Sequence, residues 1–201
     1  QAARDAFYHG DIAAKIAGYH RENGGWLRED DLADFAVEVL PPVVSTYKDI
    51  DVYTCGPWSQ GPVLAQSLRL ADGLNIDSYP HNSADYIHLL VESLKLSFSD
   101  RHHYVGDPNF VDVPMDELLA DDYMSTRADL IKLDKAISGM PAPGVISGFQ
   151  IHQERSGDPP SADFRESTQI DTSYICVVDE AGNLFSSTPS DAMANAPIIP
   201  G

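Results

Sequence analysis

The last part of the chain constrains the fold most, because two strand-like runs are separated there by a turn. The runs are "TSYICVVD" at residues 172–179 and "NLFSSTPS" at residues 183–190. Gly182 or Asn183 can take the positive φ that such a hairpin loop needs. An antiparallel hairpin is therefore expected over residues 172–190.

The pairing register of this hairpin decides which residue faces Thr172. If Val178 pairs with Leu184, counting back along both strands places Thr172 opposite Ser190. A slip of one residue would place Asp191 there instead. Either register sets a hydroxyl or a carboxylate opposite Thr172. Composition alone favours a surface hairpin with a few exposed hydroxyl groups.

The chain before the hairpin has mainly helical patterns, so an α+β class is expected. Residues 62–73 begin with a proline and end with a glycine, which are typical helix boundaries. Residues 83–103 form the longest predicted helix, and residues 43–55 predict one or two strands. The apolar stripe that should face the core on the longest helix consists of Ile87, Leu90, Val91, Leu94 and Phe98.

A stretch rich in Pro, Gly, Ser and charged residues lies between the helical part and the hairpin. We expect three segments: a helix-rich segment at 1–138, a linker at 139–171, and a hairpin segment at 172–201. A long linker inside a domain is unusual. A flexible and exposed approach is what a cleavage site requires.

Composition excludes some classes of partner. The 201 residues include 31 Asp and Glu against 13 Lys and Arg, for a net charge of −18. Nucleic acids and anionic membranes both need a basic face, so neither is expected as a partner. The sequence starts at Gln1 without a Met, and we expect it to be a piece of a longer protein. No signal peptide is visible, and the compartment is left open between cytoplasm and periplasm or secretion.

Cysteine and histidine positions do not predict a metal site or a disulfide. Cys55 and Cys176 flank apolar runs and are expected to be buried free thiols. His102, His103 and Asp107 could suggest a metal site, but adjacent histidines on a helix point in different directions. A structural role is therefore preferred for them, and no metal or organic cofactor is expected.

The segment "DTSYICVVDEAGNLFSSTPSD" resembles the start of the small subunit in the gamma-glutamyltranspeptidase family, with its pattern Thr-Thr-His-x-Ser-Val-Val-Asp-x-x-Gly-Asn. Upstream blocks, among them "VYTCGPWSQGPVLAQSLRLADG" and "LLVESLKLSFSDRHHYVGDPNF", are similar to the end of the large subunit, in the same order. The resemblance covers nearly all of residues 6–191. It implies an N-terminal nucleophile hydrolase with a four-layer αββα fold, of which this chain is part.

By position, the resemblance implies that Thr172 is the nucleophile and that Ser190 hydrogen-bonds to it. It implies autocleavage between Asp171 and Thr172, and we expect Ser173 and Asp191 to contact the substrate. Cleavage would give Thr172 an α-amino group, whose pKa near 7.7–8.0 suits a general base at neutral pH. One residue would then supply both nucleophile and base. The acyl-enzyme would pass its acyl group to water or to an amine.

Three departures from the family pattern leave the donor open. Tyr174 replaces a His, Cys176 replaces a Ser, and Ala192 stands where an Asn commonly contacts the substrate carboxylate. The leading hypothesis is a zymogen that becomes a γ-glutamyl transferase or hydrolase, as in glutathione metabolism. Alternatives are a glutaryl-type or other amidase or acylase of the same superfamily, and a non-catalytic structural or binding relative.

The resemblance also implies missing partners for this site. An upstream Arg that clamps the donor and a downstream Gly-Gly oxyanion hole complete it in the family, and neither lies in residues 1–201. We therefore expect the remaining parts of its own chain as partners, together with a small amide substrate. The chain alone is expected to be inactive and uncleaved, and homo-oligomerisation is left open.

Overall fold

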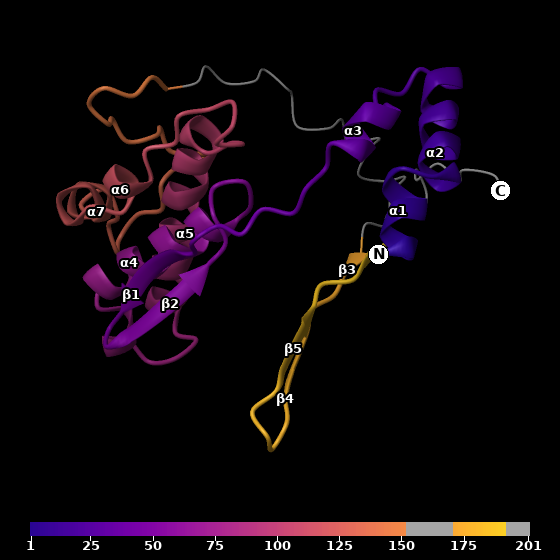
Figure 1. The fold of residues 1–201 in the computed structure, drawn as a ribbon. Helices are drawn as coiled ribbons and strands as arrows, with labels where there is room; N and C mark the ends of the chain where they lie inside the picture. Colours follow the sequence, from indigo (N-terminus) through magenta and orange to yellow (C-terminus); the bar gives the residue numbers. More distant parts are fainter. Residues whose placement is uncertain (152–170, 192–201) are drawn as a thin grey trace. The chain divides into compact units, whose positions relative to one another are not determined.

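The structure is a computed structural model and describes residues 1–151 and 171–191. It is helix-rich, with three two-stranded antiparallel sheets in the described ranges, which confirms the predicted α+β class (Figure 1). The helices are α1 (Ala2–Tyr8), α2 (Asp11–Glu22), α3 (Glu29–Ala33), α4 (Gly61–Gly73), the 3₁₀ turn η1 (Ile76–Ser78), α5 (Ala84–Tyr104), α6 (Met115–Leu118) and α7 (Asp121–Ala128). The strands are β1 (Val43–Tyr47), β2 (Ile50–Thr54), β3 (Asp171–Thr172), β4 (Ile175–Val178), β5 (Leu184–Ser187) and β6 (Ser190–Asp191).

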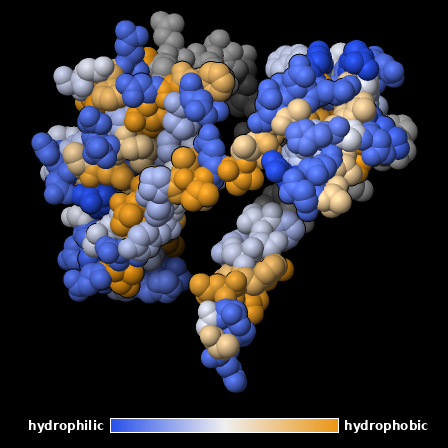
Figure 2. All heavy atoms as spheres, viewed as in Figure 1, coloured by the Kyte–Doolittle hydropathy of each residue, from blue (hydrophilic) through white to orange (hydrophobic). Residues whose placement is uncertain are grey.

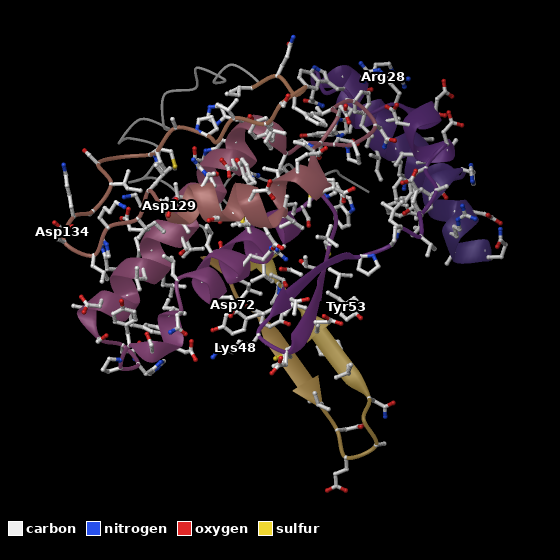
Figure 3. The ribbon with its side chains drawn as sticks, turned by 90° about the vertical axis from the view of Figure 1, so that its left-hand side faces the viewer. Arg28, Lys48, Tyr53, Asp72, Asp129 and Asp134 are labelled. Atoms are coloured by element: carbon white, nitrogen blue, oxygen red, sulfur yellow. The ribbon has the colours of Figure 1, made fainter. Side chains whose placement is uncertain are left out.

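Contacts divide the chain into two units, residues 1–38 with 157–201 and residues 39–156. In the first, helices α1 to α3 form a small cluster in which the rings of Tyr8 and Phe35 stack with centroids 5.5 Å apart. Helix α3 starts where the Arg28 N–H donates to Asp31 Oδ2 at 2.8 Å (Figure 3). The three segments expected from the sequence remain a prediction.

The second unit begins with the β1–β2 hairpin. Tyr47 pairs with Ile50, and Lys48 lies in the turn between the strands with a φ of 54° (Figure 3). The sequence predicted one or two strands over this stretch, and the structure has two.

Helix α4 packs on this hairpin at close range. The Ser45 hydroxyl of β1 donates to the Ala65 carbonyl of α4 at 3.2 Å. At the start of α4, a Cβ on Gly61 would lie 1.8 Å from the carbonyl oxygen of Cys55. Position 61 therefore needs a glycine, since any side chain would push the helix away from the end of β2.

The main core of this unit lies between α4, α5 and α7, and α4 contacts both other helices. Its buried apolar side chains are Leu70, Ala71, Ile76, Leu89, Leu96, Met124 and Ile131. A smaller cluster consists of Tyr104, Leu118 and Ile146.

Helix α5 confirms the predicted long helix but reverses its predicted orientation. Ser83 caps it, because its Oγ accepts the Tyr86 N–H at 3.2 Å. The predicted apolar stripe is wrong as a buried face: four of its five side chains are exposed and Leu94 is half-buried. The buried side chains of α5 are Leu89, Glu92, Ser93, Leu96, Ser97, Ser99, Asp100 and Tyr104.

Glu92 shows why this buried face is polar. It is 2% exposed, and its Oε2 accepts the Ile137 N–H at 3.0 Å while Oε1 accepts Lys95 Nζ at 2.8 Å. Lys95 Nζ also donates to the Ile137 carbonyl. Burial raises the pKa of Glu92, but the Lys95 ammonium and the Ile137 N–H outweigh it and hold the pKa below its ordinary value.

Asp100 is the second buried anchor and is 1% exposed. Its Oδ1 pairs with Arg127 of α7 at 3.0 Å and accepts the Gly144 N–H at 2.9 Å. Its Oδ2 accepts the Gln66 side-chain amide of α4 at 3.2 Å. Arg127 also donates to the Ala142 carbonyl at 3.1 Å, so one buried ion pair joins three helices and the segment after α7.

These bonds fix residues 137–149, here called the strap, onto α5. The Ser99 hydroxyl donates to the Pro141 carbonyl at 2.6 Å, and the Tyr104 hydroxyl donates to the Gly144 carbonyl at 2.7 Å. The strap has no helix or strand, and its main chain is bound by side chains of α5 and α7. The remaining linker residues 152–170 lie outside the described part of the chain.

Replacing Asp100 with Ala should destabilise this unit strongly. Arg127 would stay buried without its partner, which typically costs about 3–5 kcal/mol. Asp121→Ala is the matched control, because it removes the exposed partner of Arg69 and should change the free energy of unfolding by less than about 1 kcal/mol. Urea unfolding of this chain measures both, and equal effects of the two substitutions would contradict the assigned role of Asp100.

Candidate active site

The hairpin at residues 171–191 has the register that was predicted by counting back from its turn. Strands β4 and β5 pair Val178 with Leu184, and strands β3 and β6 pair Thr172 with Ser190. The alternative with Asp191 opposite Thr172 is excluded, since Asp191 pairs with Asp171. The four residues of β3 and β6 are thus next to one another at the open end of the hairpin.

The turn that fixes this register is built around Asp179. Its Oδ1 accepts the N–H groups of Ala181 at 2.9 Å and Asn183 at 2.8 Å, and its Oδ2 accepts the Asn183 side-chain amide at 2.7 Å. These bonds, led by the one from the Asn183 side chain, lower the pKa of Asp179. Gly182 has a φ of 80°, so the positive φ expected at position 182 or 183 is found at Gly182.

A proline divides the hairpin into two short ladders. The Ser173 N–H donates to the Pro189 carbonyl at 2.9 Å, but Pro189 has no N–H with which to return the bond. The ladder is therefore interrupted between β3–β6 and β4–β5, although the register is the same on both sides. The sequence reasoning did not single out Pro189 or Asp179, and a proline within a strand-like run was the available signal for the interruption.

Opposite residues in an antiparallel pair of strands alternate between hydrogen-bonded and non-hydrogen-bonded pairs, and this alternation shows which type the Thr172–Ser190 pair is. Interstrand hydrogen bonds join Asp179 to Asn183 and Ser173 to Pro189, which are both positions of the hydrogen-bonded type. Hydrogen-bonded pairs recur at every second residue. Thr172 and Ser190 are each one residue from the Ser173–Pro189 pair and therefore form a non-hydrogen-bonded pair. In that type of antiparallel pair the two Cα atoms lie closer, at about 4.5 Å.

The side chains of the β4–β5 hairpin are almost all exposed. Figure 2 shows hydrophobic side chains gathered along these strands and hydrophilic ones at the turn. Cys176 is an exposed free thiol, and so is Cys55, so the expected burial of both cysteines is wrong. Tyr174, which replaces the family His, is exposed, and its hydroxyl oxygen accepts Ser186 Oγ at 3.2 Å. Ser173 is exposed as well, and Ala192 lies outside the described residues.

The histidines of α5 take part in helix and ring contacts. His103 Nδ1 lies 2.8 Å from the Ser99 carbonyl oxygen, and the His102 ring lies 6.4 Å from that of Phe98. Within residues 1–151 and 171–191, no group of three or more His, Cys, Asp or Glu side chains could hold a metal ion. Nor does this part of the chain contain a helix long and apolar enough to cross a membrane.

Comparison with known proteins identifies the family. A family model described as Gamma-glutamyltranspeptidase matches residues 1–194, which include the whole described hairpin. The chain belongs to the gamma-glutamyltranspeptidase family. The resemblance expected from the hairpin and the upstream blocks is thereby confirmed.

Individual relatives agree with this family. A glutathione hydrolase proenzyme from Bacillus subtilis subsp. natto is 32% identical over 188 residues, which are 92% of this chain and 31% of the relative. An Acylase ACY 1 proenzyme from Pseudomonas sp. (strain SE83) is 30% identical over 185 residues, or 92% of this chain and 29% of the relative. This chain thus spans about a third of the length of these relatives.

A solved structure shows the same relation in three dimensions. The gamma-glutamyltranspeptidase from Pseudomonas nitroreducens, complexed with L-DON, matches with a TM-score of 0.62 and 34% identity. The match covers 69% of this chain and 43% of that one. The fold described above is therefore part of a gamma-glutamyltranspeptidase fold.

Proposed function

We propose that this chain is part of an autoprocessing enzyme in which Thr172 is the nucleophile and which acts on γ-glutamyl amides. The observation that carries the proposal is the pairing of Thr172 with Ser190 in a hairpin that the family model matches. Relatives named proenzymes agree with a precursor that must be processed.

Processing starts at the peptide bond between Asp171 and Thr172. The Thr172 hydroxyl oxygen attacks the Asp171 carbonyl carbon, the C–N bond breaks, and the nitrogen takes up a proton as the free amine. The resulting ester joins Asp171 to the Thr172 oxygen. Water then hydrolyses this ester, which leaves a carboxylate on residue 171 and restores the hydroxyl of Thr172.

Turnover uses the amine that processing creates. An α-amino group has a pKa of about 7.7–8.0, so a usable fraction is neutral near pH 7 and can take the proton of the Thr172 hydroxyl. The oxygen attacks the substrate amide, the amine product leaves with that proton, and an acyl ester forms on Thr172. Water or an acceptor amine then attacks the ester and releases the acyl group.

The proposal gives polar contacts to three further residues of the hairpin: Ser190 contacts the nucleophile, and Ser173 and Asp191 contact the donor. Residues directly opposite in an antiparallel pair have Cβ atoms about 4.5–5.5 Å apart, a distance at which Ser190 can orient the nucleophile. Ser173 and Asp191 flank the pair and would contact the polar end of the donor.

The complete site requires polypeptide outside these residues. The segments 1–138, 139–171 and 172–201 correspond in this proposal to the end of a large subunit, a linker and the start of a small subunit. A missing oxyanion donor typically lowers the rate about 10²–10³-fold. Residues 1–201 alone should therefore be inactive, and the rest of the chain is their first partner.

An acylase is the second candidate, because an acylase proenzyme is 30% identical over 92% of this chain. Tyr174, which replaces the family His, also leaves the identity of the acyl donor open. The chemistry of Thr172 would be the same, and only the acyl group of the substrate would differ.

Thr172→Ala in the full-length protein should abolish both processing and amide hydrolysis, with activity falling at least about 10³-fold. Thr172→Ser should retain both at a reduced rate, because it keeps a hydroxyl nucleophile. Ser186→Ala, an exposed hydroxyl of the same hairpin, is the matched control and should change neither. Gel electrophoresis and anilide hydrolysis measure the effects. Survival of both activities in Thr172→Ala would remove Thr172 as the nucleophile and favour a non-catalytic role for the hairpin.

The purified chain of 201 residues should remain intact at 21.9 kDa. Intact-mass spectrometry after incubation at pH 7–8 is the measurement. The appearance of pieces 1–171 and 172–201 would show that the chain needs no further polypeptide for processing.

The donor can be assigned with two anilides that differ only in an α-amino group. The full-length protein should hydrolyse γ-glutamyl p-nitroanilide with a kcat/KM at least about 10-fold above that for glutaryl p-nitroanilide, because a site that pairs the amino group leaves polar groups unsatisfied without it. The reverse order would make the protein an acylase.

A further inference from the structure

Two residues of like charge face each other at the bond where processing is proposed. Strands β3 and β6 pair Asp171 with Asp191, directly beside the pair of Thr172 with Ser190. Residues opposite one another in such a ladder have Cβ atoms about 4.5–5.5 Å apart, and like charges there are destabilising. No Lys, Arg or His occurs between residues 166 and 201, so the neighbouring sequence offers no cation to neutralise the pair.

Processing would leave Asp191 as the charged residue of this hairpin that is nearest to the nucleophile. The charged residues of segment 171–191 are Asp171, Asp179, Glu180 and Asp191. Asp171 becomes the end of the other piece when the chain is cut. Asp179 and Glu180 lie at the turn, seven and eight residues after Thr172, and an extended strand rises about 3.3 Å per residue.

Residue 171 of the precursor marks the place for the acyl group of a donor. In the proposed chemistry, the same hydroxyl oxygen attacks the carbonyl carbon of Asp171 during processing and the acyl carbon of the donor during turnover. The two carbons therefore occupy the same place beside Thr172. The rest of the acyl group occupies the place that residue 171 leaves, which is opposite Asp191 in the ladder.

The length of the acyl chain decides which chemical group comes to this place. In Asp171 the carboxyl carbon is the third carbon beyond the main-chain carbonyl carbon. In a γ-glutamyl donor the third carbon is the α-carbon, which carries an ammonium and a carboxylate. A glutaryl donor has the same chain with a methylene at that carbon. A γ-glutamyl donor thus brings a positive charge opposite Asp191, and a glutaryl donor brings none.

We propose that Asp191 determines donor specificity by pairing with the ammonium group of the acyl chain. A carboxylate and an ammonium form a charge-assisted hydrogen bond, which is stronger than one between neutral groups. An acyl group without the ammonium leaves the Asp191 carboxylate unpaired and adds its own negative charge beside it, which disfavours that donor. The inference rests on the proposed function, because it takes Thr172 as the nucleophile, and it names the group that the site recognises.

Asp191→Asn in the full-length protein tests this assignment. The wild-type protein should hydrolyse γ-glutamyl p-nitroanilide with a kcat/KM at least about 10-fold above that for glutaryl p-nitroanilide. Asp191→Asn should lower this ratio at least about fivefold, mainly through slower hydrolysis of the γ-glutamyl donor, because the charge that pairs with the ammonium is gone. A smaller change in the ratio would overturn the proposal.

Glu180→Gln is the matched control. It removes the charge of an exposed carboxylate at the turn of the same hairpin, far along the strand from Thr172. The ratio of the two donors should be the same as in the wild-type protein. An equal fall of the ratio in both variants would assign the effect to the overall charge of the hairpin and overturn the role of Asp191.

Two smaller donors test the proposal without any variant, in case Asp191→Asn does not fold or is not processed. 4-Aminobutyryl p-nitroanilide carries an ammonium on the third carbon and has no carboxylate, and butyryl p-nitroanilide has the same carbon chain without charge. The wild-type protein should have a kcat/KM at least about fivefold higher for the first. Equal values, or a preference for the butyryl donor, would overturn the proposal.

The results separate this inference from the proposed function. If Thr172→Ala abolishes hydrolysis while Asp191→Asn keeps the wild-type donor ratio, Thr172 remains the nucleophile and Asp191 does not select the donor. If the wild-type protein prefers the glutaryl donor, selection by Asp191 is likewise overturned and the nucleophile stands. If Thr172→Ala retains hydrolysis, both proposals fail.

Discussion

The carboxylate of Asp100 holds the larger unit of the structure together. A buried carboxylate must be paired, and this one finds an arginine on α7, an amide on α4 and a main-chain N–H of the strap. The rotation of α5 follows from these contacts, because a helix that keeps Asp100 inward must point the opposite stripe outward. The position of the strap follows as well, because it is bound through its main chain by side chains of α5 and α7.

This arrangement explains where sequence reasoning succeeded and where it did not. The start of α5 at Ser83, the β1–β2 hairpin and the register of the final hairpin were predictable, since caps, β-branched runs and a Gly-Asn turn act locally. The buried face of α5 was not predictable from periodicity, because an apolar stripe marks a surface to be covered without saying by which part of a protein. Glu92 and Asp100 lie inside because a strap without regular structure offers main-chain groups for them to bind.

The candidate site also has one feature that the sequence could predict and one that it could not. The pairing of Thr172 with Ser190 could be derived by counting, because the register of a hairpin is set by its turn. The exposure of Cys176 could not be derived, since a strand that is apolar on both faces predicts a covered sheet whether or not the cover belongs to the same segment. Both failures, on α5 and on the hairpin, have one cause: an apolar pattern marks a surface to be covered but does not say which residues cover it.

Pro189 has a further effect on a hairpin of this kind. The strand "YICVV" is β-branched and aromatic, carries no charge, and lies at an open edge, which is the composition of segments that recruit other chains into intermolecular sheets. By removing the donor that would face Ser173 inside the hairpin, the proline interrupts the regular ladder and leaves β4 and β5 with four residues each. Short edge strands limit edge-to-edge pairing between proteins, so a single missing N–H lowers the tendency of this hairpin to aggregate.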